Sequence, residues 1–191
     1  MDMSAHITAD NLGIMRGERM LFRDLSLRVS AGEAILLRGA NGAGKTTLLR
    51  CLAGLTHAET GTASCQSFHW IGHRSGVKPH ETPFEHLYIW ATAYGSSKVM
   101  ISAVMQKMGL QRAKDVAGSQ LSAGQRRRTA LARTQLTHRP VWLLDEPFAA
   151  LDENGKAMLG ALIKEHRENG GSVLAAVHGD VPILDVREVI L

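Results

Sequence analysis

The sequence contains few cysteines, few aromatic residues and no long hydrophobic run. Its two cysteines, Cys51 and Cys65, are too few for a disulfide framework and favour a reduced, cytosolic compartment. No run of about 18 apolar residues is present, so we expect no segment that spans a bilayer. The first ten residues include acidic side chains and no apolar stretch, and we therefore expect no secretory signal there.

The composition is that of an ordinary folded domain. Hydrophobic residues make up 45% of the 191 residues, charged residues 21% and aromatic residues 5%, which excludes disordered and collagen-like classes. The 22 basic and 18 acidic side chains leave a net charge of +4, which favours a solvated surface over a basic face for a membrane or nucleic acid. A chain of this length forms one core and has room for an inserted subdomain.

Apolar patterns along the chain predict strands and helices in turn. Short continuous apolar runs at 34–37 and 141–144 are typical of strands covered on both faces, and 172–177 shows a third buried-strand pattern. The middle of the chain shows helical stretches instead, so we expect a mainly helical insert at about 74–135. We predict a single α/β domain over 1–191, with an N-terminal β part and a mostly parallel core sheet.

A phosphate-binding loop is the strongest motif. Residues 39–46 match the pattern G-x-x-x-x-G-K-[ST], after a buried strand and before a helical pattern that includes Leu52 and Leu55. Lys45 is expected to reach the β- and γ-phosphates, and the Thr46 hydroxyl to ligate Mg²⁺. Nucleotide binding is therefore assigned to one continuous segment: Gly39, Ala40, Asn41, Gly42, Ala43, Gly44, Lys45, Thr46 and Thr47.

Two adjacent carboxylates follow the apolar run at 141–144. We expect Asp145 to hold Mg²⁺ and Glu146 to polarise the attacking water. Adjacent acids after a strand are also common in turns, so the pair becomes specific only together with the phosphate loop. Ligands bind at the carboxyl ends of the strands in open parallel sheets, which is where these two acids fall.

A third motif begins a helix that is rich in arginine. It consists of Leu121, Ser122, Ala123, Gly124 and Gln125. Ser122 and Gln125 have the spacing of a capping box, and a helix N-terminus attracts phosphate. A capped helix without a ligand is the alternative. The arginines at 126–128 lack interleaved aromatic residues, so a solvated helix face is favoured over a nucleic-acid patch.

The order of these motifs resembles that of the ATP-binding cassette (ABC) ATPases over nearly the whole chain. The third motif is similar to the family signature Leu-Ser-Gly-Gly-Gln, with Ala123 in place of the first glycine. The resemblance implies a P-loop NTPase fold with an antiparallel N-terminal β part, and a head-to-tail homodimer that encloses ATP and Mg²⁺. It also implies that each signature contacts the partner's ATP, that Asp152 lies in the loop crossing to the partner, and that His178 contacts the γ-phosphate during catalysis.

Two positions depart from the general pattern of the family. The glutamine that senses Mg²⁺ and the transporter falls at His73, whose imidazole is an uncertain Mg²⁺ ligand. The aromatic residue that stacks on adenine falls at Arg16, whose guanidinium can stack less hydrophobically on a base. The pattern at Arg16 therefore does not predict whether the site discriminates adenine from other nucleotide bases.

Residues 70–78, 121–128 and 142–148 are similar to the ATP-binding subunits of cytochrome c maturation haem exporters. That resemblance implies ATP hydrolysis that drives haem export or release of a haem-loaded chaperone. It further implies a peripheral protein on the cytoplasmic face of the bacterial inner membrane, with integral membrane subunits that dock around 73–87. We expect neither nucleic-acid binding nor direct haem binding. The alternatives are an ABC ATPase for another substrate and a non-transport ABC ATPase.

Overall fold

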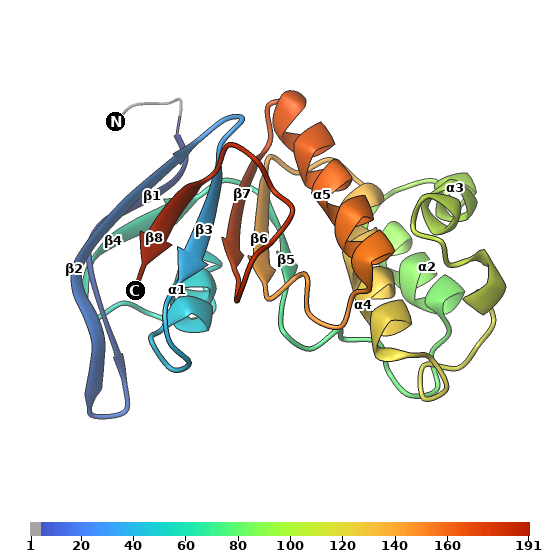
Figure 1. Ribbon diagram of the computed structural model, residues 1–191, viewed down its shortest axis with the longest axis horizontal. Coiled ribbons are helices and arrows are strands. Elements are labelled where there is room, and N and C mark those ends of the chain that lie inside the picture. The colour runs from blue at the N-terminus through green and yellow to red at the C-terminus, as the bar shows by residue number, and fades with distance from the viewer. Residues whose placement is uncertain (1–4) are drawn as a thin grey trace. The chain divides into compact units, whose positions relative to one another are not determined.

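The computed structural model describes residues 5–191 (Figure 1). These residues form two compact units. The first, here called the sheet unit, contains the chain up to Trp70 together with Arg139–Glu146 and Gly160–Leu191. The second, the helical unit, contains Ile71–His138 and Pro147–Leu159. The insert expected at about 74–135 falls within the helical unit, which also takes in a later segment of the chain.

Two sheets are formed by the strands. The antiparallel sheet has the order β2 (Arg19–Ser30), β1 (Ala5–Arg16) and β4 (Thr60–Cys65). The second sheet has the order β5 (Phe68–Ile71), β6 (Val141–Asp145), β7 (Ser172–Ala176), β3 (Ala34–Arg38) and β8 (Arg187–Ile190), and the pairs β6–β7, β7–β3 and β3–β8 are parallel. This arrangement confirms the predicted parallel core sheet and antiparallel N-terminal part.

The central strands of the second sheet are buried, as their continuous apolar runs predict. Every residue of β6 and β7 is buried, which requires cover on both faces. Ala176 of β7 is the register partner of both Leu37 on β3 and Asp145 on β6. The carboxyl ends of these three strands therefore lie in one row, and the segments that follow them emerge at the same edge of the sheet (Figure 1).

The helices belong to both units. Helix α1 (Lys45–Leu52) lies in the sheet unit, and the helical unit contains α2 (Pro83–Tyr94), α3 (Val99–Lys107), α4 (Ala123–Ala132) and the short 3₁₀ helices η1 (Gln111–Ala113) and η2 (Arg133–Gln135). Helix α5 (Glu153–Glu168) begins in the helical unit and ends in the sheet unit. Thr82 and Glu85 form a capping box at the start of α2, which fixes where that helix begins.

Two local expectations differ from the structure. Helix α1 ends at Leu52, and Gly54 has a left-handed φ of 69°, so Leu55 lies beyond the helix and is 56% exposed. The strands β4 and β5 were missed in the sequence. Most of β4 is exposed and made of threonine, glycine, alanine and serine, so it has none of the apolar alternation by which strands are recognised.

Candidate nucleotide-binding and hydrolysis site

The loop between β3 and α1 is shaped by its glycines. Gly39, Gly42 and Gly44 have φ values of 135°, 83° and 109°, which only glycine adopts without strain. A Cβ at Gly39 would lie 2.5 Å from the carbonyl oxygen of Leu191, so the space also excludes a side chain. Gly44 has no side chain with which to cap α1, and the backbone N–H groups of the first turn remain available to an anion.

The Lys45 ammonium group is held inside this loop. Lys45 is buried, and its Nζ donates to the carbonyl oxygens of Gly39 at 2.7 Å and Ala40 at 3.1 Å. A buried cation beside the N-terminal end of a helix creates a positive potential at the centre of the loop. The arrangement is suited to a phosphate group, and the role expected for Lys45 remains a prediction.

Thr46 and Asp145 meet although they are 99 positions apart in the sequence. The Thr46 Oγ1 hydroxyl donates to the Asp145 carboxylate, at 3.1 Å from Oδ1 and 3.0 Å from Oδ2. Hydroxyl and carboxylate oxygens are hard donors of the kind that Mg²⁺ prefers. Within residues 5–191 there is no group of three or more histidine, cysteine or acidic side chains that could hold a metal ion. A Mg²⁺ ion at this pair would therefore need water and phosphate as further ligands.

Glu146 and His178 form a second close pair at the same edge of the sheet. The backbone N–H of Glu146 donates to the Ala176 carbonyl oxygen at 2.9 Å, which extends the β6–β7 pairing by one residue. His178 Nε2 lies 3.4 Å from Glu146 Oε1, and both side chains are partly exposed. Glu146 has a left-handed φ of 51°, a conformation that costs a non-glycine residue about 1 kcal/mol or more.

The signature segment begins α4 in the helical unit, and its capping box is confirmed. The Ser122 hydroxyl accepts from the Gln125 N–H at 3.1 Å, and Gln125 Oε1 accepts from the Ser122 N–H at 2.8 Å. A Cβ at Gly124 would lie 3.0 Å from the Ala150 carbonyl oxygen, so the helix start packs closely on that loop. Leu121 is buried, whereas Ser122 and Ala123 are exposed.

Comparison with known proteins places these motifs in a family. The family described as ABC transporter matches residues 22–149. The cytochrome c biogenesis ATP-binding export protein CcmA of Hyphomonas neptunium is 56% identical over 90% of this chain and 89% of its own length. CcmA of Maricaulis maris is 40% identical over 96% of this chain and 90% of its own length. The chain belongs to the CcmA family of ABC transporter ATP-binding proteins.

Solved structures of ABC proteins share the fold of this CcmA family member. An ATP-binding subunit of an ABC transporter superposes with a TM-score of 0.81 at 24% identity, covering 90% of this chain and 79% of the other. An ABC ATP-binding protein from Pyrococcus furiosus superposes with a TM-score of 0.80 at 20% identity, covering 97% and 96%. An ABC-type P-loop NTPase fold is thereby confirmed, and its family membership makes the chain an ATPase subunit.

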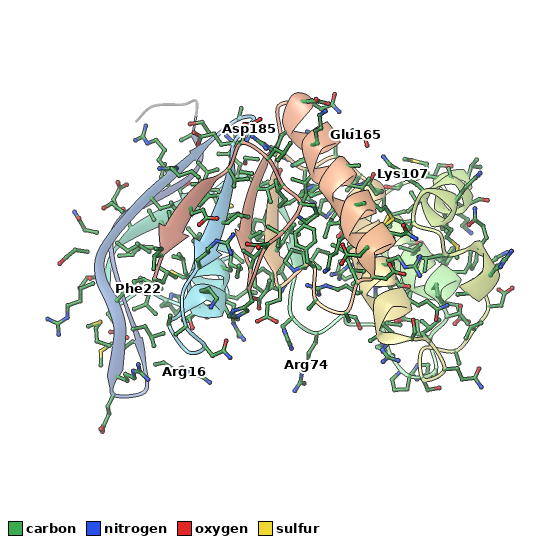
Figure 2. The ribbon with its side chains drawn as sticks, in the orientation of Figure 1. Arg16, Phe22, Arg74, Lys107, Glu165 and Asp185 are labelled. Atoms are coloured by element: carbon green, nitrogen blue, oxygen red, sulfur yellow. The ribbon has the colours of Figure 1, made fainter. Side chains whose placement is uncertain are left out.

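The three remaining predicted residues occupy different places. Arg16 is exposed at the end of β1, where it pairs in register with Arg19 (Figure 2). His73 is exposed and lies just after β5. Asp152 caps α5, because its Oδ1 accepts from the Gly155 N–H at 2.8 Å. The roles expected for them at the base, the metal and the partner remain predictions.

Two residues near the phosphate loop were missed in the sequence. Arg38 ends β3, and its Nη1 donates to the Gly179 carbonyl oxygen at 2.6 Å while its Nε lies 2.7 Å from Glu188 Oε1. It therefore ties the start of the phosphate loop to the residue after His178. Phe22 packs on Gly44, where an added Cβ would lie 3.0 Å from the ring (Figure 2). Neither residue belongs to a motif, because both contacts depend on tertiary structure.

The arginines at 126–128 are not a solvated helix face, which corrects the expectation for this segment. Arg127 is 5% exposed, and Arg126 and Arg128 are half-buried. Arg126 Nη1 donates to the carbonyl oxygens of Leu121 and Gly118, at 2.5 and 3.3 Å. All three arginines donate to backbone carbonyl groups within the helical unit, so their pattern in the sequence reflects packing.

Proposed function

We propose that this chain is the ATP-hydrolysing subunit of an export complex in cytochrome c biogenesis, where hydrolysis energises haem export or the release of a haem-loaded chaperone. The observation that carries the hydrolytic part is the meeting of Thr46 with Asp145 and of His178 with Glu146 at one edge of the sheet. The haem-related part is supported by the likeness to relatives that are named cytochrome c biogenesis export proteins.

In this proposal, separate residues of the chain bind the phosphates of ATP, activate the attacking water and contact the γ-phosphate. The phosphate loop and Lys45 bind the phosphates, the Glu146 carboxylate orients and polarises the attacking water, and His178 donates a hydrogen bond to the γ-phosphate. Thr46 and Asp145 would hold Mg²⁺ directly or through water. The ion, when bound, neutralises charge that develops on the phosphate oxygens. Arg16 would lie against the base and His73 near the metal, as their positions in the family pattern imply.

The site is completed by a second copy of the chain. The exposed Ser122 and Ala123 at the capped start of α4 offer a helix N-terminus to the γ-phosphate bound by the partner, and Asp152 lies in the loop that would cross to it. ATP would favour the closed homodimer and ADP the open one, so that hydrolysis drives a cycle of closing and opening. Nucleic acid has no role in this proposal, and haem binds elsewhere in the complex.

Membrane subunits are the remaining partners. No helix in residues 5–191 is long and apolar enough to cross a membrane. A groove of about 440 Å³ in the helical unit, at the start of α2, is lined by Lys78, His80, Glu81, Phe84, Glu85, Tyr88 and Ile89. This groove overlaps the region around 73–87 where we expect integral subunits to dock, and Ile89 in its lining is 54% exposed. We place the chain on the cytoplasmic face of the bacterial inner membrane.

The proposal is tested by expressing the chain with its genomic neighbours in membranes. Wild type is compared with Lys45→Ala and Glu146→Gln, and ATP hydrolysis is measured alongside the haem held on the periplasmic chaperone. We expect both variants to lose hydrolysis and haem-loaded chaperone to accumulate. Loss of hydrolysis with unchanged haem handling would leave an ABC ATPase for another substrate, and the haem assignment would fail. Copurification with ribosomes or DNA instead of membrane subunits would favour a non-transport ABC ATPase.

A further inference from the structure

Arg127 is a buried arginine whose burial none of the motifs explains. It lies on α4, two residues after the signature ends at Gln125, and it is 5% exposed. A guanidinium group keeps its charge in a protein and carries five N–H donors, so its burial is tolerated only where acceptors surround it. The position of those acceptors indicates what Arg127 does.

The acceptors come from two loops of the helical unit. Arg127 Nε donates to the Pro147 carbonyl oxygen at 3.2 Å, and Nη1 donates to the Gly72 carbonyl oxygen at 2.8 Å. A longer contact of 3.5 Å joins Nη1 to the carbonyl oxygen of His73. The planar fork of a guanidinium group suits it to hold two separate segments at once, which an ammonium group does less well.

Both loops follow strands whose ends carry proposed functional residues. Gly72 and His73 directly follow β5, and Pro147 is bonded to Glu146 after β6. The proline ring fixes φ at Pro147, so a hydrogen bond to its carbonyl group restricts the peptide that leads back to Glu146. Arg127 therefore acts on the backbone next to Glu146 and His73, while its own helix begins with the signature.

A hollow of about 220 Å³ lies beside these contacts, lined by His73, Ser75, Ala123, Arg126, Arg127, Ala149 and Ala150. Side chains leave this space open, although the start of α4 packs closely on Ala150 at its margin. The hydrogen bonds of Arg127 act together with that contact in holding the loops on α4. Hydrogen bonds from a charged donor such as this one are stronger than those between neutral groups.

We propose that Arg127 is a positioning residue for ATP hydrolysis, which joins the helix that carries the signature to the backbone at Pro147, next to Glu146 in the chain, and at Gly72 and His73. The inference rests on the proposed function, because it matters only if Glu146 and the signature serve the same reaction. Arg127 acts through Gly72 and Pro147 and does not touch the nucleotide. Its loss should therefore lower turnover and leave the affinity for ATP unchanged.

The test uses the full chain with its membrane subunits, in the membranes described above. Arg127→Met removes the donors at similar length, Arg127→Lys keeps the charge without the fork, and Arg128→Met is the matched control on the same helix. Arg128 makes a contact of only 3.5 Å, to the Met108 carbonyl oxygen. The kcat and KM for ATP are measured together with thermal unfolding, and Glu146→Gln is assayed in parallel.

We expect Arg127→Met to lower kcat by about 10- to 100-fold, with KM within about twofold of wild type. The kcat of Arg127→Lys should lie between those of Arg127→Met and the wild type. The control should keep the wild-type kcat. A kcat in Arg127→Met equal to that of Arg128→Met would overturn the inference, as would a rise in KM at unchanged kcat. If Arg127→Met does not fold, Arg127→Lys decides, and a wild-type kcat there would also overturn it. Continued hydrolysis by Glu146→Gln would instead count against the proposed function.

Discussion

The imidazole Nε2 of His178 lies 3.4 Å from the carboxylate Oε1 of Glu146, although 32 positions separate the two residues. The β6–β7 pairing causes this proximity, because Glu146 follows Asp145 and His178 follows shortly after Ala176, the register partner of Asp145. Side chains from two adjacent parallel strands are thus delivered to one point at their carboxyl ends. The pair places a carboxylate acceptor for a water molecule beside an imidazole donor for a phosphate oxygen.

Removal of either member of this pair is expected to abolish most hydrolysis. We expect Glu146→Gln and His178→Ala each to lower kcat by about 100-fold or more, because general-base assistance and hydrogen bonding to the phosphate are lost. ATP should still bind, since the phosphate loop is untouched. Glu153→Gln is the matched control, because Glu153 is exposed and pairs only with Lys156 in the described contacts. Steady-state kinetics and an ATP-binding assay measure these effects. A variant that kept half of the wild-type kcat would contradict the role proposed for its residue.

The contact between Thr46 and Asp145 predicts how hydrolysis depends on Mg²⁺. Thr46→Val removes the hydroxyl group and keeps the shape, so the Mg²⁺ concentration for half-maximal hydrolysis should rise by about tenfold or more. Thr46→Ser keeps the hydroxyl group and should behave as wild type. A Mg²⁺ titration at fixed ATP compares the two variants. Equal half-maximal Mg²⁺ concentrations for Thr46→Val and Thr46→Ser would show that Thr46 is not a metal ligand.

A buried pair in the helical unit predicts sensitivity of the fold to acid. His86 Nδ1 lies 2.8 Å from Glu81 Oε2, and both residues are buried. Burial lowers the pKa of His86 below its usual 6.5, against the opposing hydrogen bond and charge of Glu81. Burial alone would raise the pKa of Glu81, but hydrogen bonds from His86 and from the Lys78 N–H, with their charges, lower it overall. His86 Nε2 has no hydrogen-bond partner among the described residues, so protonation there is unfavourable.

The direction of the pH effect follows from these shifts. Below pH 6.5 the unfolded chain takes up a proton at His86 that the folded chain resists, so stability decreases as the pH falls. Glu81 adds stability above its unfolded pKa of 4.5 that is lost as the pH falls through its lower folded value. We expect the unfolding temperature to drop between pH 7 and pH 5, and to drop less in His86→Gln. An equal drop in both proteins would contradict this account.

Gly171 is a position where a single methyl group should destabilise the protein. A Cβ there would lie 2.2 Å from the His166 ring, and that ring stacks on Trp142 with 4.1 Å between centroids. Because the ring is held, Gly171→Ala should cost about 3 kcal/mol, which lowers Tm by roughly 6–12 °C. Gly17→Ala is the control, since its Cβ meets nothing within 4 Å and only its φ of 62° is unfavourable, at about 1 kcal/mol.

A substitution at His166 tests whether the loss of stability in Gly171→Ala comes from a clash with the His166 ring. Replacement of His166 by alanine removes the ring that the new Cβ would meet. In the double variant, Gly171→Ala should therefore cost much less than it does alone, as calorimetry of the four proteins would measure. Additive losses would show that the clash is not the cause.

The sequence by itself determined those features that depend on residues close together in the chain. The glycines of the phosphate loop, the capping box of Ser122 and Gln125, and the buried strands β3, β6 and β7 all follow from local pattern and local hydrogen bonding. The strand β4 was missed because its exposed residues have no such pattern. The family could be inferred from the same motifs, since their chemistry requires residue types at short spacing.

The tertiary structure alone decided which distant residues meet. The order β6, β7, β3 in the sheet brings Asp145 to Thr46 and Glu146 to His178, and local sequence does not specify strand order. Folding likewise buried Arg127, although the sequence predicts a solvated helix face there. The carbonyl groups of two distant loops accept hydrogen bonds from its Nε and Nη1. Long-range pairing is set by the fit of whole surfaces, and residue types along the chain carry little of that information.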